Sequence, residues 1–115
     1  MEKTRPTAIA VSENLIFIGF SNGVINAFTK EGQKPYGTYQ DSSKDFVQNP
    51  VTCMDIHPKR PDYLVAGFNG GQLVLIDTTE IKKAVKKISD HHFKCPVVSI
   101  KFCDWIKERN IKDVL

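Results

Sequence analysis

Residues Val51–Asp77 read VTCMDIHPKRPDYLVAGFNGGQLVLID. This segment predicts three consecutive β-strands, Val51–Ile56, Tyr63–Phe68 and Gln72–Asp77, because each is a short apolar run bounded by polar or turn-forming residues. Asn69–Gly71 joins the last two strands and predicts a hairpin, since Asn and Gly tolerate the positive φ that tight turns require. Strands this short and apolar are unstable alone in water, so the unit must pack against neighbouring units.

The same pattern occurs earlier in the chain. Strands are predicted at Pro6–Val11, Leu15–Phe20 and Val24–Thr29, and Ser21–Gly23 forms the turn between the last two. Lys34–Gln40 is expected to add a weak outer strand. The first part of the chain therefore contains one complete unit of the kind seen in the second part.

The two units are copies of one template. Met54 lies 45 residues after Ile9, Gly67 lies 48 residues after Gly19, and a third copy of the first strand places Ile100 46 residues after Met54. The difference between 45 and 48 residues falls in a polar loop, where a change of length leaves the strands in register. A period of this length with strand–loop–strand–turn–strand content is typical of propeller blades.

The predicted fold class is all-β: a partial β-propeller with two four-stranded antiparallel blades and the first strand of a third. A short C-terminal helix is compatible with the charged end of the chain. The expected boundaries are 6–40 for blade one, 41–50 for a linker, 51–90 for blade two, 91–104 for the start of blade three and 105–115 for an irregular or helical tail.

The end of blade two has two interpretations. The repeat predicts an outer strand at Ala84–Asp90, whereas local propensity favours an amphipathic helix over Thr79–Ile88 with Ile81, Val85 and Ile88 on one face. Both interpretations remain open at this stage.

Composition and charge narrow the functional classes. The 115 residues allow at most one domain, and 41% apolar with 25% charged residues is typical of a globular protein. A net charge of +3 is too small to indicate nucleic-acid binding. No apolar run reaches the roughly 18 residues that span a bilayer, and the N-terminus resembles no secretion signal, so a cytoplasmic location is expected.

No catalytic or cofactor-binding motif is found, and the chain is predicted not to be an enzyme. His57 precedes a proline in a turn, where an imidazole that faces solvent or bonds to the backbone is expected. Asp55 and Asp77 are expected to accept hydrogen bonds from turn or inter-strand donors. The three cysteines form no C-x-x-C pair, which indicates reduced thiols. An alternative from another class is a zinc- or thiol-dependent enzyme, disfavoured because a second ligand cluster is missing. It would use His91, His92, Cys95 and Cys103.

The densest charge is a lysine cluster between positions 82 and 87. Lysines on an outer strand block unwanted strand pairing, so a solvated edge is the simpler interpretation. A surface for an acidic partner or for anionic lipid is the alternative. Partner contact is expected through loops such as Ser21–Gly23, Lys30–Lys34 and Asn69–Gly71. The candidate contact residues are Ser21, Asn22, Gly23, Asn69, Gly70, Gly71, Lys82, Lys83, Lys86 and Lys87.

Three segments resemble WD40-type blades: PTAIAVSENLIFIGFSNGVINAF, the Val51–Asp77 segment, and SDHHFKCPVVSIKF. More narrowly, VAGFNGGQLVLID and SDHHFKCPVVSIKF resemble the N-terminal propeller of the vacuolar protein sorting-associated protein eight family, the Rab-binding subunit of the CORVET endosomal tether. The resemblance implies vesicle tethering in endosomal protein transport, through a Rab GTPase and other complex subunits, peripherally on endosomal membranes. A generic WD40-like scaffold of another complex is the alternative.

The sequence departs from the WD40 pattern in two places. Phe28-Thr29 and Ile76-Asp77 stand where a third strand usually ends in Trp-Asp, and Asn22 and Asn69 replace the usual turn aspartate.

Repeat arrays need about three units to bury a continuous core, and this chain contains two complete units. The isolated chain is therefore predicted to self-associate or to be marginally stable.

Overall fold

A computed structural model describes residues 4–40, 49–57, 59–60, 62–82 and 84–88 of the chain. Within these residues the protein is all-β and contains no helix. The predicted start of blade three, 91–104, and the predicted tail, 105–115, lie outside the described residues, as does most of the linker and Lys83.

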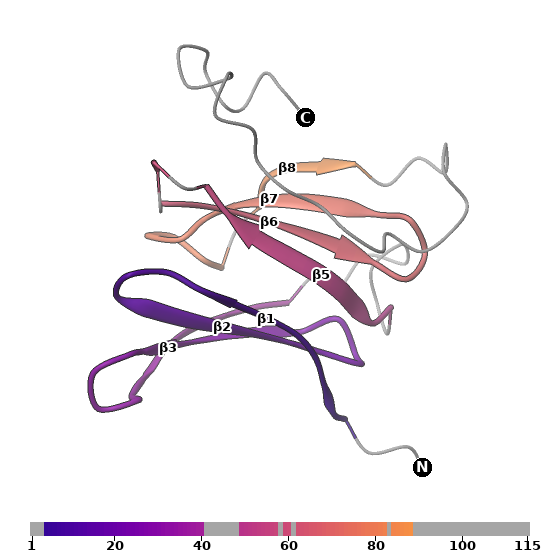
Figure 1. Ribbon diagram of the computed structural model, residues 1–115. Helices are drawn as coiled ribbons and strands as arrows, with labels where there is room; N and C mark the ends of the chain where they lie inside the picture. Colours follow the sequence, from indigo (N-terminus) through magenta and orange to yellow (C-terminus); the bar gives the residue numbers. More distant parts are fainter. Residues whose placement is uncertain (1–3, 41–48, 58, 61, 83, 89–115) are drawn as a thin grey trace.

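Blade one is a four-stranded antiparallel sheet with strand order β1-β2-β3-β4 (Figure 1). The predicted strands are confirmed, with the third beginning one residue later than expected and the fourth one residue shorter at each end. The strands are β1 Pro6–Val11, β2 Leu15–Phe20, β3 Ile25–Thr29 and β4 Pro35–Tyr39.

Blade two repeats this arrangement with strand order β5-β6-β7-β8. Its strands are β5 Val51–Ile56, β6 Tyr63–Phe68, β7 Leu73–Asp77 and β8 Ala84–Ile88. The helix considered for Thr79–Ile88 is therefore wrong, and the outer strand is confirmed over 84–88. Pairing with the free edge of β7 satisfies the backbone of this segment, and this tertiary interaction overrides a weak local preference for helix.

The two blades share one template down to their irregularities. Ala8 pairs with Gly19 in blade one, and Cys53 pairs with Gly67 at the matching place in blade two. In each blade the register shifts just before this pair. It also shifts at matching places between the third and fourth strands, at Ala27/Phe28 and Leu75/Ile76.

The hairpin turns of the two blades also match. Gly23 has a φ of 86° and Gly71 a φ of 92°, and each donates its N–H to the last residue of the preceding strand, Phe20 or Phe68, at 3.0 Å. The left-handed conformation therefore falls on the final glycine of each turn. An L-residue there would be strained, which explains why both copies carry glycine.

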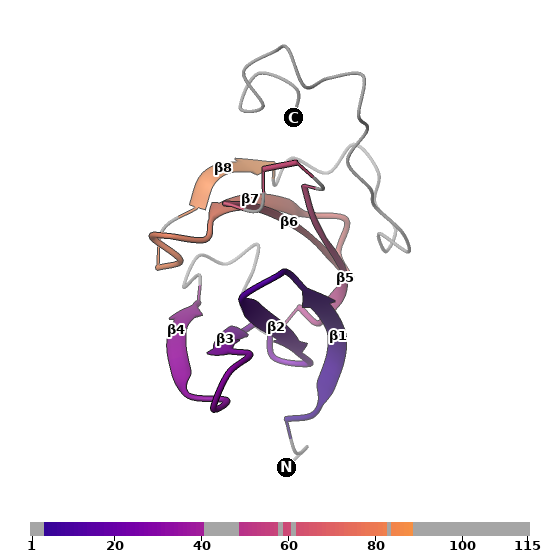
Figure 2. The same ribbon diagram turned by 60° about the vertical axis from the view of Figure 1, so that its left-hand side comes forward.

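The hydrophobic core lies between the two sheets, which stack face to face with β1 beside β5 (Figure 2). Alternate residues of β6, Leu64, Ala66 and Phe68, belong to it and are fully buried. The complete buried cluster is Phe17, Ile25, Ala27, Tyr39, Val51, Leu64, Ala66, Phe68, Val74, Ile76 and Ile81.

Blade one has one face packed on blade two and one face that points away from it. The residues on the face that points away correspond, in the repeat, to the residues of blade two that pack against blade one. Ile9 and Val11 are 64% and 53% exposed, whereas their counterparts Met54 and Ile56 are half-buried against the core. Further along the same face, half-buried residues match fully buried ones: Ile16 with Leu64, Ile18 with Ala66, Phe20 with Phe68, Asn26 with Val74 and Phe28 with Ile76. Blade one thus presents to solvent a face whose counterpart in blade two is packed in the core.

We expect the 115-residue chain to self-associate through this face, and the double substitution Ile9→Ser/Val11→Ser to weaken the association at least ~10-fold. Burying an Ile or Val side chain contributes about 1.5–3 kcal/mol, and each 1.4 kcal/mol changes an equilibrium constant tenfold. Sedimentation equilibrium over a range of concentrations measures the effect. Glu13→Ser, an exposed residue in the β1–β2 turn, is the control and should change nothing. A monomeric parent chain would contradict the expectation.

Candidate functional site

The candidate contact loops fall at two opposite ends of the blades. The β2–β3 and β6–β7 turns lie at one end, where Ser21 N–H donates to the Arg5 carbonyl and Asn69 N–H to the Pro50 carbonyl, both at 2.9 Å. Figure 1 shows both turns on the same side of the molecule. We call this the hairpin end: Arg5, Pro50 and the turns 21–23 and 69–71.

Within the hairpin end, two asparagines face solvent. Asn22 and Asn69 are exposed, whereas Gly23 and Gly71 are buried and Ser21 and Gly70 are half-buried. Asn22 Oδ1 accepts the Val24 N–H at 3.2 Å, which orders the first turn, and Ser21 Oγ accepts the Arg5 N–H at 3.1 Å. Side-chain contacts with a partner at this end would therefore involve the asparagines more than the glycines.

The Lys30–Lys34 loop lies at the other end, which we call the connector end. Lys30 N–H donates to the Asn14 carbonyl at 2.9 Å, so this loop adjoins the β1–β2 turn. In blade two, Thr78 N–H donates to the Asp62 carbonyl at 2.8 Å, which ties the 78–82 connector to the loop after β5. The three loops named from the sequence therefore do not form one surface.

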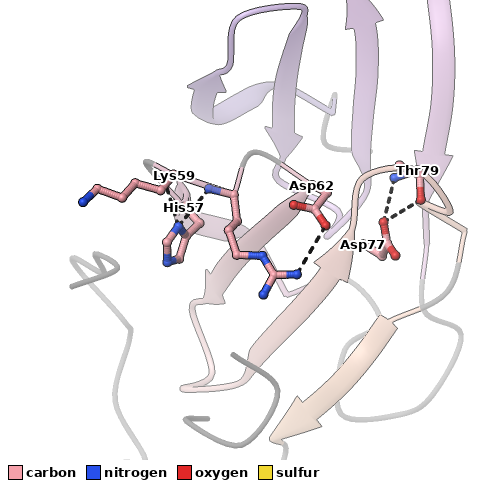
Figure 3. Close-up of polar contacts among 6 residues, drawn as sticks. His57, Lys59, Asp62, Asp77 and Thr79 are labelled. Atoms are coloured by element: carbon pink, nitrogen blue, oxygen red, sulfur yellow. Dashed lines mark hydrogen bonds and ion pairs between the residues drawn. The ribbon is translucent and has the colours of Figure 1, made fainter. Parts of the chain in front are cut away.

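His57 organises the longer loop of blade two at the connector end. The residue is only 1% exposed, and its Nδ1 accepts the backbone N–H groups of Lys59 at 3.1 Å and Arg60 at 3.0 Å (Figure 3). The expected backbone-bonded state is confirmed, and the solvent-facing alternative is wrong. At the matching position of blade one, Ser12 Oγ accepts the Leu15 N–H at 3.0 Å. A side-chain acceptor thus closes the loop in both blades.

Arg60, in the same loop as His57, makes two contacts on the surface. Its guanidinium lies 4.9 Å from the ring centroid of Tyr63, a cation–π geometry, and 4.0 Å from the Asp62 carboxylate. Both charged side chains of this pair, Arg60 and Asp62, are more than 40% exposed, so the ion pair contributes little to stability.

Asp77 has a local structural role. Its Oδ1 accepts the backbone N–H of Thr79 at 2.9 Å and the hydroxyl of the same residue at 2.7 Å (Figure 3). The carboxylate closes the turn after β7, which confirms its assignment to turn donors rather than to proton transfer. Thr29, the matching residue of blade one, donates its hydroxyl to the Glu31 carbonyl at 2.8 Å and so serves a similar turn.

The lysine cluster spreads over the connector and the outer strand. Lys82 and Lys87 are exposed and Lys86 is half-buried. Lys86 and Lys87 lie on β8, the last strand of its sheet among the described residues. This placement agrees with both the solvated edge and the acidic-partner surface expected from the sequence.

The residues of the zinc or thiol alternative, His91, His92, Cys95 and Cys103, lie outside the described residues. In the part of the chain that the structure describes, no group of three His, Cys, Asp or Glu side chains is placed to hold a metal ion. Stoichiometric zinc in the purified protein would support that alternative.

Cys53 is the free thiol that the structure describes. Burial raises the pKa of the Cys53 thiol above its ordinary value of 9.0, although hydrogen bonds from Thr52 and the Gly67 backbone oppose the shift. The thiolate is the reactive form, so this thiol is poorly reactive at neutral pH.

We expect iodoacetamide at pH 8 to alkylate Cys53 at least ~5-fold more slowly in the folded chain than in 6 M guanidinium, measured in a Cys95→Ser/Cys103→Ser variant. Folding raises the pKa of the Cys53 thiol, so the protonated thiol is favoured in the folded chain. The stability that this shift contributes is fully present below the pKa of the unfolded thiol, and it is lost as pH rises through the pKa of the folded thiol. Equal rates in both states would contradict this assignment.

Comparison with known proteins identifies the family. A family model described as the Vps8 beta-propeller matches residues 1–113. The chain belongs to the Vps8 beta-propeller family. No curated protein sequence matches it.

Solved structures agree with the Vps8 propeller assignment at the level of the fold. A chain in the crystal structure of the mitotic checkpoint complex is similar with a TM-score of 0.71 and 17% identity, over 89% of this chain and 30% of that one. The crystal structure of RRP9 WD40 repeats is similar with a TM-score of 0.66 and 15% identity, over 80% and 28%. The chain thus spans less than a third of either propeller protein.

Membership of the Vps8 family makes this chain part of a protein-interaction propeller, a scaffold type that is typically not enzymatic. Among the described residues, none form a helix able to cross a bilayer. The WD40 resemblance and the fold class predicted from the sequence are confirmed.

Proposed function

We propose that the chain is the interaction module of an endosomal vesicle-tethering subunit that acts in endosomal and vacuolar protein trafficking together with a Rab GTPase. The match of the Vps8 propeller family over residues 1–113 is the observation that carries this proposal. The family resemblance also supports partners among other tethering-complex subunits and a peripheral, cytoplasmic position on endosomal membranes.

The architecture supports a binding role. Paired sheets with a continuous buried core form a rigid base, and loops on such a base are suited to partner recognition. The hairpin end presents Asn22 and Asn69, which are both neutral and exposed. We assign the contact with the Rab GTPase to this end.

A pull-down of nucleotide-loaded Rab GTPases by the tagged 115-residue chain tests the function. We expect at least one Rab to be retained in its GTP form and at least ~5-fold less in its GDP form. Asn22→Arg/Asn69→Arg should abolish retention, because two bulky charged side chains would occupy the surface on which the partner is expected to lie. Lys59→Glu, exposed at the connector end, is the control and should retain binding.

Two results would overturn parts of the proposal. Absence of nucleotide-dependent binding to every Rab would favour the generic WD40-like scaffold. Retention that survives the double asparagine substitution but is lost with Lys59→Glu would move the partner site to the connector end.

A further inference from the structure

Both hairpin turns contain the dipeptide Asn-Gly, at Asn22-Gly23 in blade one and at Asn69-Gly70 in blade two. Asparagine is chemically labile, and it is most labile before glycine, because glycine has no side chain to hinder attack of its backbone nitrogen on the asparagine Cγ. The reaction is a deamidation. Sequence alone makes the two dipeptides equivalent, but the structure distinguishes them.

The two dipeptides occupy different positions in matching turns. Each turn is closed by a backbone hydrogen bond of 3.0 Å from its final glycine, Gly23 or Gly71, to the last residue of the preceding strand. Asn22 directly precedes the closing glycine, whereas Asn69 stands one position earlier and is followed by Gly70. The attacking nitrogen is therefore the closing N–H of the turn in blade one and a central N–H of the turn in blade two.

In blade one, hydrogen bonds hold both reacting groups. Asn22 Oδ1 accepts the Val24 N–H at 3.2 Å, which fixes the side-chain amide. Gly23 is buried, and its N–H donates to the Phe20 carbonyl. Attack requires the nitrogen and the Cγ to come into reactive contact, so both hydrogen bonds must break first. This dipeptide is protected by the fold.

In blade two, neither reacting group is held in this way. Asn69 is exposed and Gly70 is half-buried. Among the described residues, the Asn69 side chain and the Gly70 N–H form no hydrogen bond. The Asn69 backbone N–H donates to the Pro50 carbonyl at 2.9 Å, so the turn is anchored while the side-chain amide and the attacking nitrogen stay free.

Packing also favours glycine after Asn69. A Cβ placed on Gly70 would lie 2.6 Å from Gln72 Oε1 and 2.7 Å from Gln72 Nε2. Gln72 is only 4% exposed, so its amide has little room to move aside. A larger residue at position 70 would slow the attack on Asn69, but it would crowd this buried side chain. The fold thus retains the labile dipeptide.

We propose that Asn69 is a deamidation site at which the folded chain acquires aspartate or isoaspartate. The Gly70 nitrogen attacks the Asn69 Cγ, the new N–Cγ bond closes a succinimide, the Cγ–Nδ2 bond breaks, and the proton of the N–H leaves with ammonia. Water then opens the ring at either carbonyl. Both products place a carboxylate at the hairpin end, and isoaspartate also lengthens the backbone of the turn. The reaction does not depend on the proposed Rab contact.

Peptide mapping by mass spectrometry tests the proposal. The 115-residue chain is incubated at 37 °C and pH 7.4, and enzymatic methylation identifies isoaspartate. We expect Asn69 to deamidate at least ~5-fold faster than Asn22 in the folded chain, because two hydrogen bonds restrain only Asn22. In 6 M guanidinium the two rates should agree within about 2-fold, since both turns are lost. Equal rates in the folded chain, or a ratio that unfolding leaves unchanged, overturns the assignment.

A transplanted turn isolates the cause. Ser21→Asn/Asn22→Gly gives the blade-one turn the residue order of the blade-two turn, so position 21 should deamidate within about 3-fold of Asn69. Ser21→Ala is the matched control; it removes the hydroxyl that accepts the Arg5 N–H but keeps the dipeptide in place, and Asn22 should remain slow. Far-UV circular dichroism verifies that both variants are folded. Slow deamidation at position 21 in the double variant overturns the proposal.

Discussion

Gly19→Ala is expected to lower the free energy of unfolding by about 2–3 kcal/mol, the upper part of the range seen when extra carbon atoms are forced into a packed core. A Cβ on Gly19 would lie 2.6 Å from Val51 Cγ1 and 2.7 Å from Val51 Cβ. Val51 is fully buried, and its Cβ is attached directly to the backbone of β5, so the contact cannot be relieved by a rotamer change. The two blades would have to separate.

Two comparisons isolate the cause. Replacing a strand glycine by alanine normally stabilises by about 0.5–1 kcal/mol, so a loss must come from the clash. Gly37→Ala meets only the Cγ2 end of Ile81 closely and should cost less than half as much. Val51→Gly removes both the obstructing Cβ and its methyls, and a double-mutant cycle should show Gly19→Ala to be at least ~1 kcal/mol less costly in that background. Urea unfolding measures all four; additive effects would refute the clash.

His57→Ala is the second large effect, with an expected loss of about 2–4 kcal/mol. The substitution leaves a cavity at a position that is 1% exposed and removes the Nδ1 acceptor of two backbone N–H groups. Each of the two lost hydrogen bonds contributes about 0.5–1.5 kcal/mol, in addition to the lost packing of the buried ring. The loop after β5 should therefore become disordered before the rest of the blade unfolds.

His57→Asn separates hydrogen bonding from packing. The amide Oδ1 of asparagine takes nearly the place of Nδ1, so this variant should recover at least half of the stability lost in His57→Ala. Hydrogen exchange of the Lys59 and Arg60 amides reports the loop directly: fast in His57→Ala and protected in His57→Asn. Equally fast exchange in both variants would show that the two hydrogen bonds do not hold the loop.

The strands were predictable because their pattern is local. Short β-rich runs and turn glycines at Gly23 and Gly71 located seven of the eight strands without competition, and the spacing between copies showed that they form blades. The eighth strand remained ambiguous against a helix over Thr79–Ile88. Helical propensity there is genuine, and only the free edge of β7 decides against it.

The candidate site was less accessible from sequence. Ser21–Gly23, Lys30–Lys34 and Asn69–Gly71 resemble one another as polar loops, yet the structure places the second at the opposite end from the others. Sequence reasoning also missed the contact that Ile81 makes with blade one, because its partner Gly37 lies 44 positions away. The unusual glycine inside a predicted outer strand was the available signal, since glycine within a strand often marks a close approach.

The sequence alone determined the repeating unit, its strands and its turns, because alternating burial and backbone conformation are set by neighbours within a few residues of each other. Tertiary structure decided how those units pack together: which face of each sheet is buried, why Gly19 must lack a side chain, and where Ile81 of the connector approaches Gly37 of β4. Those properties depend on contacts between residues tens of positions apart, and such contacts exist only after the blades have packed.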